Sequence, residues 1–325
     1  MRILVTGPTG FIGGRLVPRL LEDDHEVTCL ARDPSKAGNW KMDSGVSLVR
    51  GDVTDPRSLE EGLAGDWDCV FHLAGAVYSD NQRWTFAVNA GGTENVLGAL
   101  DKGNIGKFVL LSSIAAIGPA RHGEYLNEET PTRPINDYGR SKLEAEGIAE
   151  RMCAQKGWPF VAVRGPVVYG PGVSPQSRVT TMFEMIRSGK YRMVGTGENR
   201  IGFCYIDNMI HGLTLVLKAP IENRETFLIA DAQSLKICEL AERIVSLIHP
   251  DMALKKVPKW LALLVSMIPG TPQELSPGRI REMVGSWGCR IDRARTVLGY
   301  EPPLSLEEGL RLTAEWFQRE VWGVK

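Results

Sequence analysis

The chain has 325 residues, and its 38 Lys and Arg residues nearly balance its 39 Asp and Glu residues. This length allows one large domain or two unequal ones, and the absence of a basic stripe argues against a nucleic-acid partner. The first residues show no signal-peptide pattern, and the longest dense apolar run, residues 260–268, is too short to cross a bilayer. The six cysteines show no metal-ligand spacing. We therefore expect reduced thiols, no metal site and a cytoplasmic protein.

The N-terminal residues predict the opening of a dinucleotide-binding fold. A strand-type run at residues 2–6 leads into the turn GPTGFIG at residues 7–13, and an amphipathic stretch follows. Gly7 allows the chain to turn, Gly10 allows the backbone to approach a pyrophosphate, and Gly13 allows the next helix to pack closely. The pyrophosphate would bind the exposed N–H groups at the start of that helix.

Strand-type and helical patterns alternate through the first half of the chain. This alternation predicts βαβ units and a doubly wound parallel sheet. We expect strands at residues 2–6, 27–30, 46–49, 69–73, 108–112 and 160–164, and helices at 15–21, 58–63, 87–102 and 138–155.

The alternation stops after residue 164. A later strand at 226–230 could return to the sheet, but the C-terminal part is predicted to be mostly helical. Its clearest helix is at 236–248. A closing helix at 305–321 begins with a serine and a glutamate at the spacing of a capping box.

These patterns place the chain in the α/β class, with a doubly wound parallel Rossmann sheet and a smaller, mostly helical C-terminal substrate domain. Residues 1–165 would form the dinucleotide-binding domain, and residues 205–231 would return to it. Residues 166–204 and 232–325 would then bind the substrate.

Three residues form a candidate catalytic set. Tyr138 and Lys142 are four residues apart in a predicted helix, so their side chains lie on one face. A lysine ammonium beside a phenol lowers the tyrosine pKa from its usual value of about 10, which allows proton exchange with an alcohol or carbonyl near neutral pH. Ser113 ends a predicted strand upstream, and its hydroxyl could bond the same substrate oxygen.

Taken in order, the motifs of this chain resemble those of the extended short-chain dehydrogenase/reductases over essentially the whole length. The matching segments are TGPTGFIG at 6–13, GDVTD at 51–55, HLAG at 72–75, NAGGTENV at 89–96, the serine pair at 112–113, Tyr138 with Lys142, RGPVVYGPG at 164–172, YIDN at 205–208 and LGYEP at 298–302.

The resemblance implies functions for individual residues. Tyr138 would be the general acid and base, Lys142 would hold the nicotinamide ribose and tune Tyr138, Ser113 would orient the substrate oxygen, and Asp52 would touch the adenine edge. Asn89 would help to order the site. The cofactor contacts implied by the resemblance come from Gly7, Thr9, Gly10, Phe11, Ile12, Gly13, Arg32, Asp52, Val53, Leu73, Ala74, Gly75, Asn89, Tyr138, Lys142, Pro166 and Val167.

The end of the second predicted strand favours NADP over NAD as the cofactor. An NAD enzyme of this fold usually has an acidic residue there, but this chain has Ala31 followed by Arg32. A guanidinium can make charge-assisted bonds to a 2′-phosphate, and Lys36 could add charge. Asp33 keeps NAD open as the alternative, because it could bind the ribose if the strand ends one residue later.

The substrate is first predicted to be apolar. The apolar run at 258–265 resembles the branch of 3β-hydroxysteroid dehydrogenases and dihydroflavonol reductases. Ile117, at a position where the family often has a tyrosine, also favours an apolar substrate. The run at 260–268 indicates core packing or a pocket wall, with peripheral membrane contact as the alternative.

We therefore expect hydride transfer between nicotinamide and a secondary alcohol or ketone of a small-molecule substrate. One alternative is a nucleotide-sugar epimerase or dehydratase that keeps its cofactor bound. Another is a cofactor-binding regulatory protein with a weak active site. Homodimerisation, which is frequent in the family, also stays open.

Overall fold

The computed structural model describes residues 1–60, 62–77, 79, 81–121, 123–268 and 276–323. Its centre is a seven-stranded sheet in the order β11-β6-β5-β4-β1-β2-β3, in which every pair of neighbours is parallel. The strands are β1 (Arg2–Thr6), β2 (Glu26–Ala31), β3 (Val46–Arg50), β4 (Cys69–His72), β5 (Phe108–Ser113), β6 (Phe160–Gly165) and β11 (Arg224–Leu228). The strand order reverses between β1 and β4, and the carboxyl ends of the strands at such a point form the usual ligand crevice.

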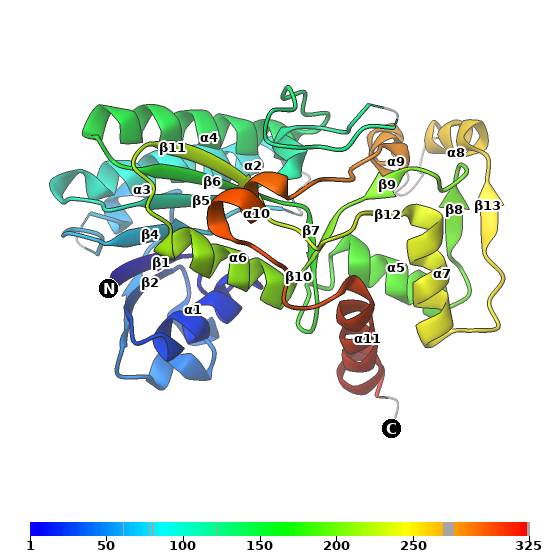
Figure 1. Ribbon diagram of the computed structural model, residues 1–325, viewed down its shortest axis with the longest axis horizontal. Helices are drawn as coiled ribbons and strands as arrows, with labels where there is room; N and C mark the ends of the chain where they lie inside the picture. Colours follow the sequence, from blue (N-terminus) through cyan, green and yellow to red (C-terminus); the bar gives the residue numbers. More distant parts are fainter. Residues whose placement is uncertain (61, 78, 80, 122, 269–275, 324–325) are drawn as a thin grey trace.

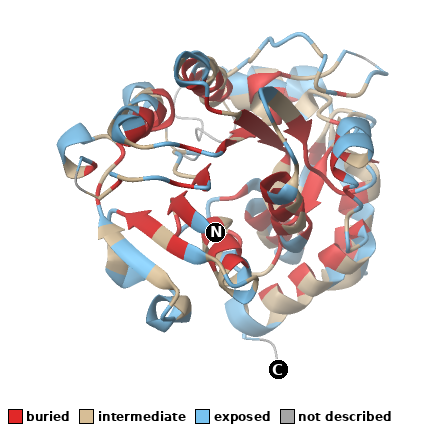
Figure 2. Ribbon diagram, turned by 60° about the vertical axis from the view of Figure 1, so that its left-hand side comes forward, coloured by how far each residue is buried: buried red, intermediate tan, exposed pale blue. Residues whose placement is uncertain are grey.

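Helices cover both faces of this sheet, as the doubly wound prediction requires. Figure 1 shows α2 (Gln82–Phe86), α3 (Gly92–Ala99) and α4 (Asp137–Lys156) above the sheet and α1 (Gly13–Glu22) and α6 (Ile206–Lys218) below it. Successive side chains of a strand point to opposite faces. The buried apolar side chains accordingly form two clusters, with Ile3 and Val5 of β1 in one and Leu4 in the other. Figure 2 shows buried residues along the strands and on parts of the surrounding helices.

The C-terminal part combines helices with small two-stranded pairs that the sequence did not predict. The pairs are β7 (Val167–Tyr169) with β10 (Phe203–Tyr205), β9 (Arg200–Ile201) with β12 (Leu235–Lys236), and β8 (Arg192–Val194) with β13 (Lys255–Val257). The helices are α5 (Arg178–Arg187), α7 (Ile237–Ile248), α8 (Lys259–Ser266), α9 (Pro277–Val284), α10 (Asp292–Leu298) and α11 (Leu306–Trp316).

Short turns of other helix types complete the chain. They are η1 (Pro34–Lys36), η2 (Asn39–Met42), η3 (Pro56–Ser58), η4 (Ala87–Gly91), η5 (Leu100–Lys102), η6 (Ile114–Ala116) and η8 (Phe317–Val321). No helix within the described ranges has both the length and the apolar character needed to cross a membrane.

The predicted strand returning near residue 226 is confirmed, because β11 pairs with β6. The predicted helix at 58–63 is wrong. Among the described residues of that segment only Ser58 is helical, as the last residue of the single turn η3, which Asp55 caps by accepting a hydrogen bond from the Arg57 N–H group at 3.2 Å. Residues 59, 60 and 62 then lie in turns. The helical segment predicted at 87–102 begins earlier, at Gln82, because Asn81 caps it.

The expectation that residues 260–268 form core is also wrong for most of their side chains, and their alternative role as a pocket wall stays a prediction. Trp260, Leu264 and Met267 are 63%, 55% and 74% exposed, and only Ala262 and Ser266 of α8 are buried. An apolar run in such a short helix does not reveal which side packs. At the last helix, Ser305 accepts the Glu308 N–H group, but Glu308 binds Arg311, so only half of the capping box is seen.

Candidate active site

The glycine turn lies between β1 and α1 and touches the segment that follows β4. Gly7 has a φ of 69°, and a Cβ on it would lie 2.8 Å from the Ala74 nitrogen. A Cβ on Gly13 would lie 2.2 Å from the Gly7 carbonyl oxygen, so this glycine lets α1 pack against the turn itself. A Cβ on Gly10 would meet only that oxygen, at 3.3 Å, which leaves the middle of the turn open.

The turn also presents unpaired donors. The N–H groups of Phe11 and Ile12 have no acceptor among the residues that the structure describes, and Ile12, the N-cap of α1, provides no side-chain cap. A helix start with free N–H groups binds anions, because the groups and the helix dipole both favour negative charge. These residues therefore fit the pyrophosphate of a dinucleotide.

The ends of β1 and β4 are tied together at the reversal of strand order. The Thr6 Oγ1 atom lies 2.8 Å from Nδ1 of His72 and accepts the Ala74 N–H group at 3.2 Å, while Leu73 donates to the Thr6 carbonyl. Burial lowers the pKa of His72 to about 3, so the ring is neutral at ordinary pH. His72 thus packs in β4 as a buried, neutral residue.

Gly139 brings the start of α4 against the end of β5. Ser113 ends β5, and its hydroxyl accepts the Ala115 N–H group at 3.1 Å. A Cβ on Gly139 would lie 2.2 Å from the Ala115 carbonyl oxygen, so only a glycine permits this approach of the two backbones. Tyr138, the residue before Gly139, thus lies on the helix turn that packs beside the segment carrying Ser113.

Lys142 lies one turn further along α4 and is buried, with 4% of its surface exposed. Its Nζ donates to the Leu111 carbonyl at 2.8 Å, and a Cβ on Gly75 would lie 3.2 Å from the same nitrogen. Burial lowers the pKa of Lys142 to about 8, while the nearby Glu146 carboxylate acts in the opposite direction. The ammonium therefore contacts the segment after β4 that the sequence predicted to line the cofactor.

Asn89 connects that segment to α4. Its Nδ2 donates to Ser141 Oγ at 2.9 Å and to the Ala76 carbonyl at 3.1 Å, and its Oδ1 accepts the Ala76 N–H group at 2.8 Å. These bonds tie the segment after β4 to α4, and the role of Asn89 in ordering the site stays a prediction.

A buried ion pair joins α4, the helix of Tyr138 and Lys142, to strand β6 of the sheet. Arg164 of β6 bonds both carboxylate oxygens of Glu146 on α4, at 3.0 and 2.7 Å, and Ser112 of β5 donates to the same carboxylate. Sequence reasoning missed this network. The sequence did contain a sign of this network, because a glutamate and an arginine stand at positions where the pattern of core elements predicts apolar residues.

The candidate residues at the adenosine end lie beyond β2 and β3. Arg32 follows directly after β2, is exposed, and makes no hydrogen bond or ion pair with any residue that the structure describes. Asp33 instead accepts the Ser35 N–H and hydroxyl groups, at 3.1 and 2.6 Å. Asp52 accepts both the N–H and hydroxyl groups of Thr54.

The remaining candidates differ in exposure. Thr9 is exposed on the glycine turn, Val53 is 7% exposed and packs in the core, and Pro166 and Val167 lie where β6 ends and β7 begins. Ile117 is 2% exposed and belongs to the larger apolar core. Ile117 therefore provides no evidence for an apolar substrate pocket.

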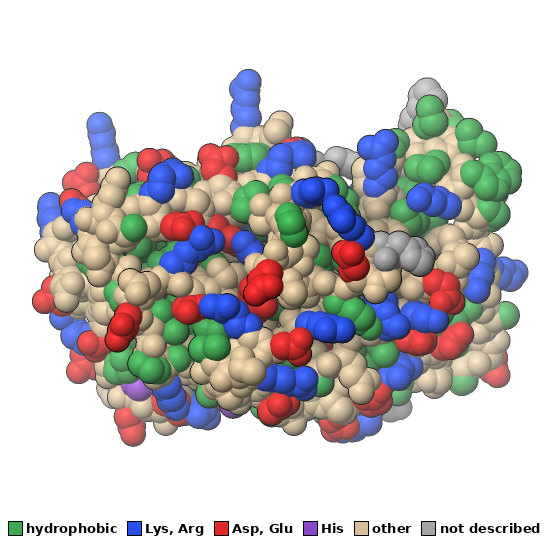
Figure 3. Space-filling view, turned by 45° about the horizontal axis from the view of Figure 1, so that its top comes forward, with side chains coloured by type: hydrophobic (Ala, Val, Ile, Leu, Met, Phe, Trp, Pro, Cys, Tyr) green, Lys and Arg blue, Asp and Glu red, His purple; other side chains and the backbone are tan. Residues whose placement is uncertain are grey.

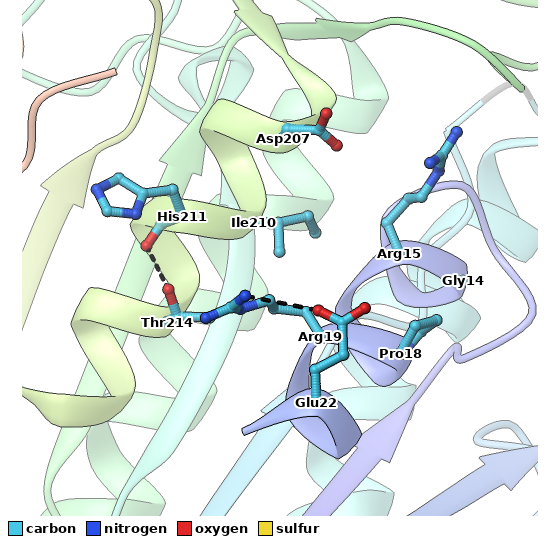
Figure 4. A pocket seen from close by; sticks show the side chains of 9 residues that line it. All are labelled: Gly14, Arg15, Pro18, Arg19, Glu22, Asp207, Ile210, His211 and Thr214. Carbon is cyan, nitrogen blue, oxygen red and sulfur yellow. Dashed lines mark hydrogen bonds and ion pairs between the residues drawn. The ribbon is translucent and has the colours of Figure 1, made fainter. Parts of the chain in front are cut away.

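A separate groove lies between α1 and α6 (Figure 4). Its lining includes Arg15, Arg19, Asp207 and His211, and Arg19 forms an ion pair with Glu22 of the same helix, α1. Asp207 lies in the first turn of α6, as expected of a residue that supports a helix start. The groove contains none of the predicted catalytic residues, and no cluster of metal-ligating side chains is found among the described residues.

Comparison with known proteins identifies the family. Residues 3–230 match the model of the NAD dependent epimerase/dehydratase family. The chain belongs to this family. It is 26% identical to an N-acetyl-alpha-D-glucosaminyl-diphospho-ditrans,octacis-undecaprenol 4-epimerase of Escherichia coli, with 97% of this chain and 94% of that protein covered.

Two further comparisons cover nearly the whole chain. A 3 beta-hydroxysteroid dehydrogenase/Delta 5-->4-isomerase of Mycobacterium tuberculosis is 28% identical, with 95% of this chain and 88% of that protein covered. The fold is also that of a dTDP-glucose 4,6-dehydratase from Streptomyces venezuelae with NAD bound, at a TM-score of 0.82 and 22% identity, with 99% and 98% covered. The predicted Rossmann fold and the resemblance to extended short-chain enzymes are both confirmed.

Proposed function

We propose that this member of the epimerase/dehydratase family oxidises a secondary alcohol of a sugar carried on a diphosphate, and that the ketone formed is an intermediate on the way to an epimer or a dehydrated sugar. The observation that carries this proposal is the packing of the first turns of α4, which carry Tyr138 and Lys142, against the end of β5 and the turn after Ser113, through the close approach at Gly139 and the bond from Lys142 to Leu111. The glycine turn provides the anion-binding part of the same edge.

Each side chain has a chemical task in this proposal. Tyr138, as its phenolate, takes the proton of the substrate hydroxyl, and the Ser113 hydroxyl donates a hydrogen bond to the same oxygen. The ammonium of Lys142 favours the phenolate by its charge. A bound nicotinamide cofactor supplies the hydride acceptor. When the reaction reverses on the other face of the ketone, Tyr138 returns the proton.

The sugar diphosphate is favoured over an apolar substrate by two observations. Ile117, one of the residues that suggested an apolar pocket, belongs instead to the apolar core. One relative that matches over nearly its whole length has a name that specifies a sugar diphosphate carried on a polyprenol. A net dehydrogenase remains the second candidate, because a steroid dehydrogenase is similar to a comparable extent.

For the cofactor we propose NADP over NAD within this NAD-dependent family. The support is that Arg32, just beyond the end of β2, has no hydrogen-bond or ion-pair partner among the described residues, whereas Oδ1 of Asp33 already accepts two hydrogen bonds from Ser35. A guanidinium can bind a 2′-phosphate. Asp33 Oδ2, which only the Lys36 ammonium approaches, at 3.8 Å, keeps NAD as the alternative.

A substrate panel tests the proposed reaction. The purified chain would be incubated with UDP-, GDP- and dTDP-sugars and with hydrophobic ketones and alcohols, each with NAD and NADP. The proposal expects conversion of a sugar without net change in reduced cofactor absorbance. Stoichiometric cofactor consumption with a hydrophobic ketone would instead establish the dehydrogenase, and cofactor binding without any turnover would establish the regulatory protein.

A further inference from the structure

The outer side of α8 is apolar and exposed. Trp260, Leu261, Leu264 and Met267 are 63%, 39%, 55% and 74% exposed, and Figure 3 shows hydrophobic side chains gathered over this helix. We call these four residues the α8 face. Soluble proteins rarely expose adjacent large apolar side chains without a binding partner, because leaving them in water is unfavourable.

The surroundings of the α8 face are basic. Lys255, Lys256 and Lys259 are all exposed, and the stretch from Met252 to Ile268 contains these three lysines and no Asp or Glu. Arg192 lies beside Lys255 in the pairing of β8 with β13. An apolar helix face bordered by lysines, with a tryptophan at its start, is the pattern of segments that bind the surface of an anionic bilayer.

We propose that the α8 face docks on the surface of an anionic lipid bilayer. The apolar side chains would enter the boundary between headgroups and acyl chains, while the three lysines would remain at the level of the negative headgroups. A second copy of the chain fits less well. In a symmetric dimer through this face, the lysines of one copy would approach those of the other, and the repulsion would oppose the contact.

The docking surface is connected to the candidate active site through α9. Helix α8 packs against α9, whose Glu282 accepts a hydrogen bond from Asn136 Nδ2 at 2.6 Å. Asn136 is the N-cap of α4, two residues before Tyr138. A bilayer under α8 would thus lie on the side of the molecule that carries the start of the catalytic helix, and a substrate held on a lipid could reach it there.

The test is flotation of the full chain with vesicles and requires no turnover, so its outcome is independent of the proposed function. Phosphatidylcholine vesicles with and without phosphatidylglycerol would be compared. We expect binding only to the anionic vesicles. The double variant Leu261→Asp, Leu264→Asp should lower the partition coefficient by about tenfold or more, the scale of losing one buried leucine. Lys255→Gln, which removes one positive charge, should lower it by about fivefold, and more at low salt.

The control is Val297→Asp, which makes one substitution of the same kind at an apolar residue of α10 that is 52% exposed. It should bind vesicles as the unchanged protein does, and near-unchanged melting temperatures would show that all variants fold. Absence of binding to anionic vesicles, or equal binding by the α8 variant and the control, would overturn the proposal. A concentration-dependent dimer that disappears in the α8 variant, without vesicle binding, would assign this face to a second copy.

Discussion

Tyr138 owes its position to the residues on either side of it. Asn136 caps α4 by accepting the Gly139 N–H group at 2.7 Å, and Gly139 lets the first turn of the helix touch the Ala115 carbonyl. Ser141, which donates to the Tyr138 carbonyl, is held in turn by Asn89. The tyrosine backbone is thus fixed by contacts that do not involve its phenol.

Replacing this phenol should therefore affect chemistry far more than structure. Tyr138→Phe should lower turnover by about 10²-fold or more, the range expected for losing a general acid or base. Cofactor affinity should barely change. Steady-state kinetics and cofactor titration by fluorescence would measure the two quantities. A variant that turns over at nearly the unchanged rate would remove Tyr138 from the mechanism.

Cofactor choice is decided by Arg32 in our proposal. Arg32→Ala should weaken NADP binding by about 1.5–3 kcal/mol, the scale of a hydrogen bond to a charged group, and leave NAD binding nearly unchanged. Arg151→Ala, at an exposed arginine of α4, is the control for loss of positive charge in general. Equal losses for the two cofactors, or tighter binding of NAD than of NADP by the unchanged protein, would refute the assignment.

At the scale of elements, sequence patterns correctly predicted those features that depend only on residues close together in the chain. Apolar runs located the strands of the sheet, because strands buried on both faces are nearly continuous in apolar residues. The spacing of Tyr138 and Lys142 on one helix likewise requires only the helical repeat. The predicted helix at 58–63 failed because a capped turn competes with helix formation there, and the pattern of α8 could not tell a packed side from an exposed one.

The contacts that assemble the site could not be predicted from local sequence patterns, because they join residues that are far apart in the chain. Asn89 meets Ser141, and Arg164 meets Glu146 across β6 and α4. Gly139 shows the same limit. Its neighbour Tyr138 was identified from the spacing to Lys142, but the reason for a glycine there appears only when η6 packs against α4. A helix-forming residue would otherwise be favoured at that position.

Two glycines of α4 test this reasoning within one helix. Gly139→Ala would place a Cβ at 2.2 Å from a backbone oxygen, so we expect lower stability and a large loss of turnover. Gly147→Ala would meet only the flexible end of Arg151 at 3.5 Å, and should raise stability by about 0.5–1 kcal/mol through helix propensity. Urea unfolding and kinetics on both variants would check the contrast, which similar effects of the two substitutions would contradict.

At the scale of the whole molecule, the site depends on the two halves of the sheet meeting at β1 and β4. The glycine turn comes from the first half, and Ser113, Tyr138 and Lys142 come from the second. Thr6 and His72 lie on either side of this junction and contact each other at 2.8 Å. Because Ala74 also donates to Thr6, the junction positions the segment that lies beside Lys142.

His72 should make the stability of this junction depend on pH. Burial lowers its pKa from 6.5 to about 3 in the folded chain. Between these two values the unfolded chain binds a proton that the folded chain does not, so stability is lost as the pH falls through this range. The slope from this one group is at most about 1.4 kcal/mol per pH unit.

His72→Phe should therefore reduce the fall in the free energy of unfolding between neutral and acidic pH. Thr6→Val, which removes the same hydrogen bond but keeps the histidine, should retain it. Urea unfolding across this range would measure all three proteins, and equal slopes for the unchanged protein and His72→Phe would show that His72 contributes nothing to acid sensitivity.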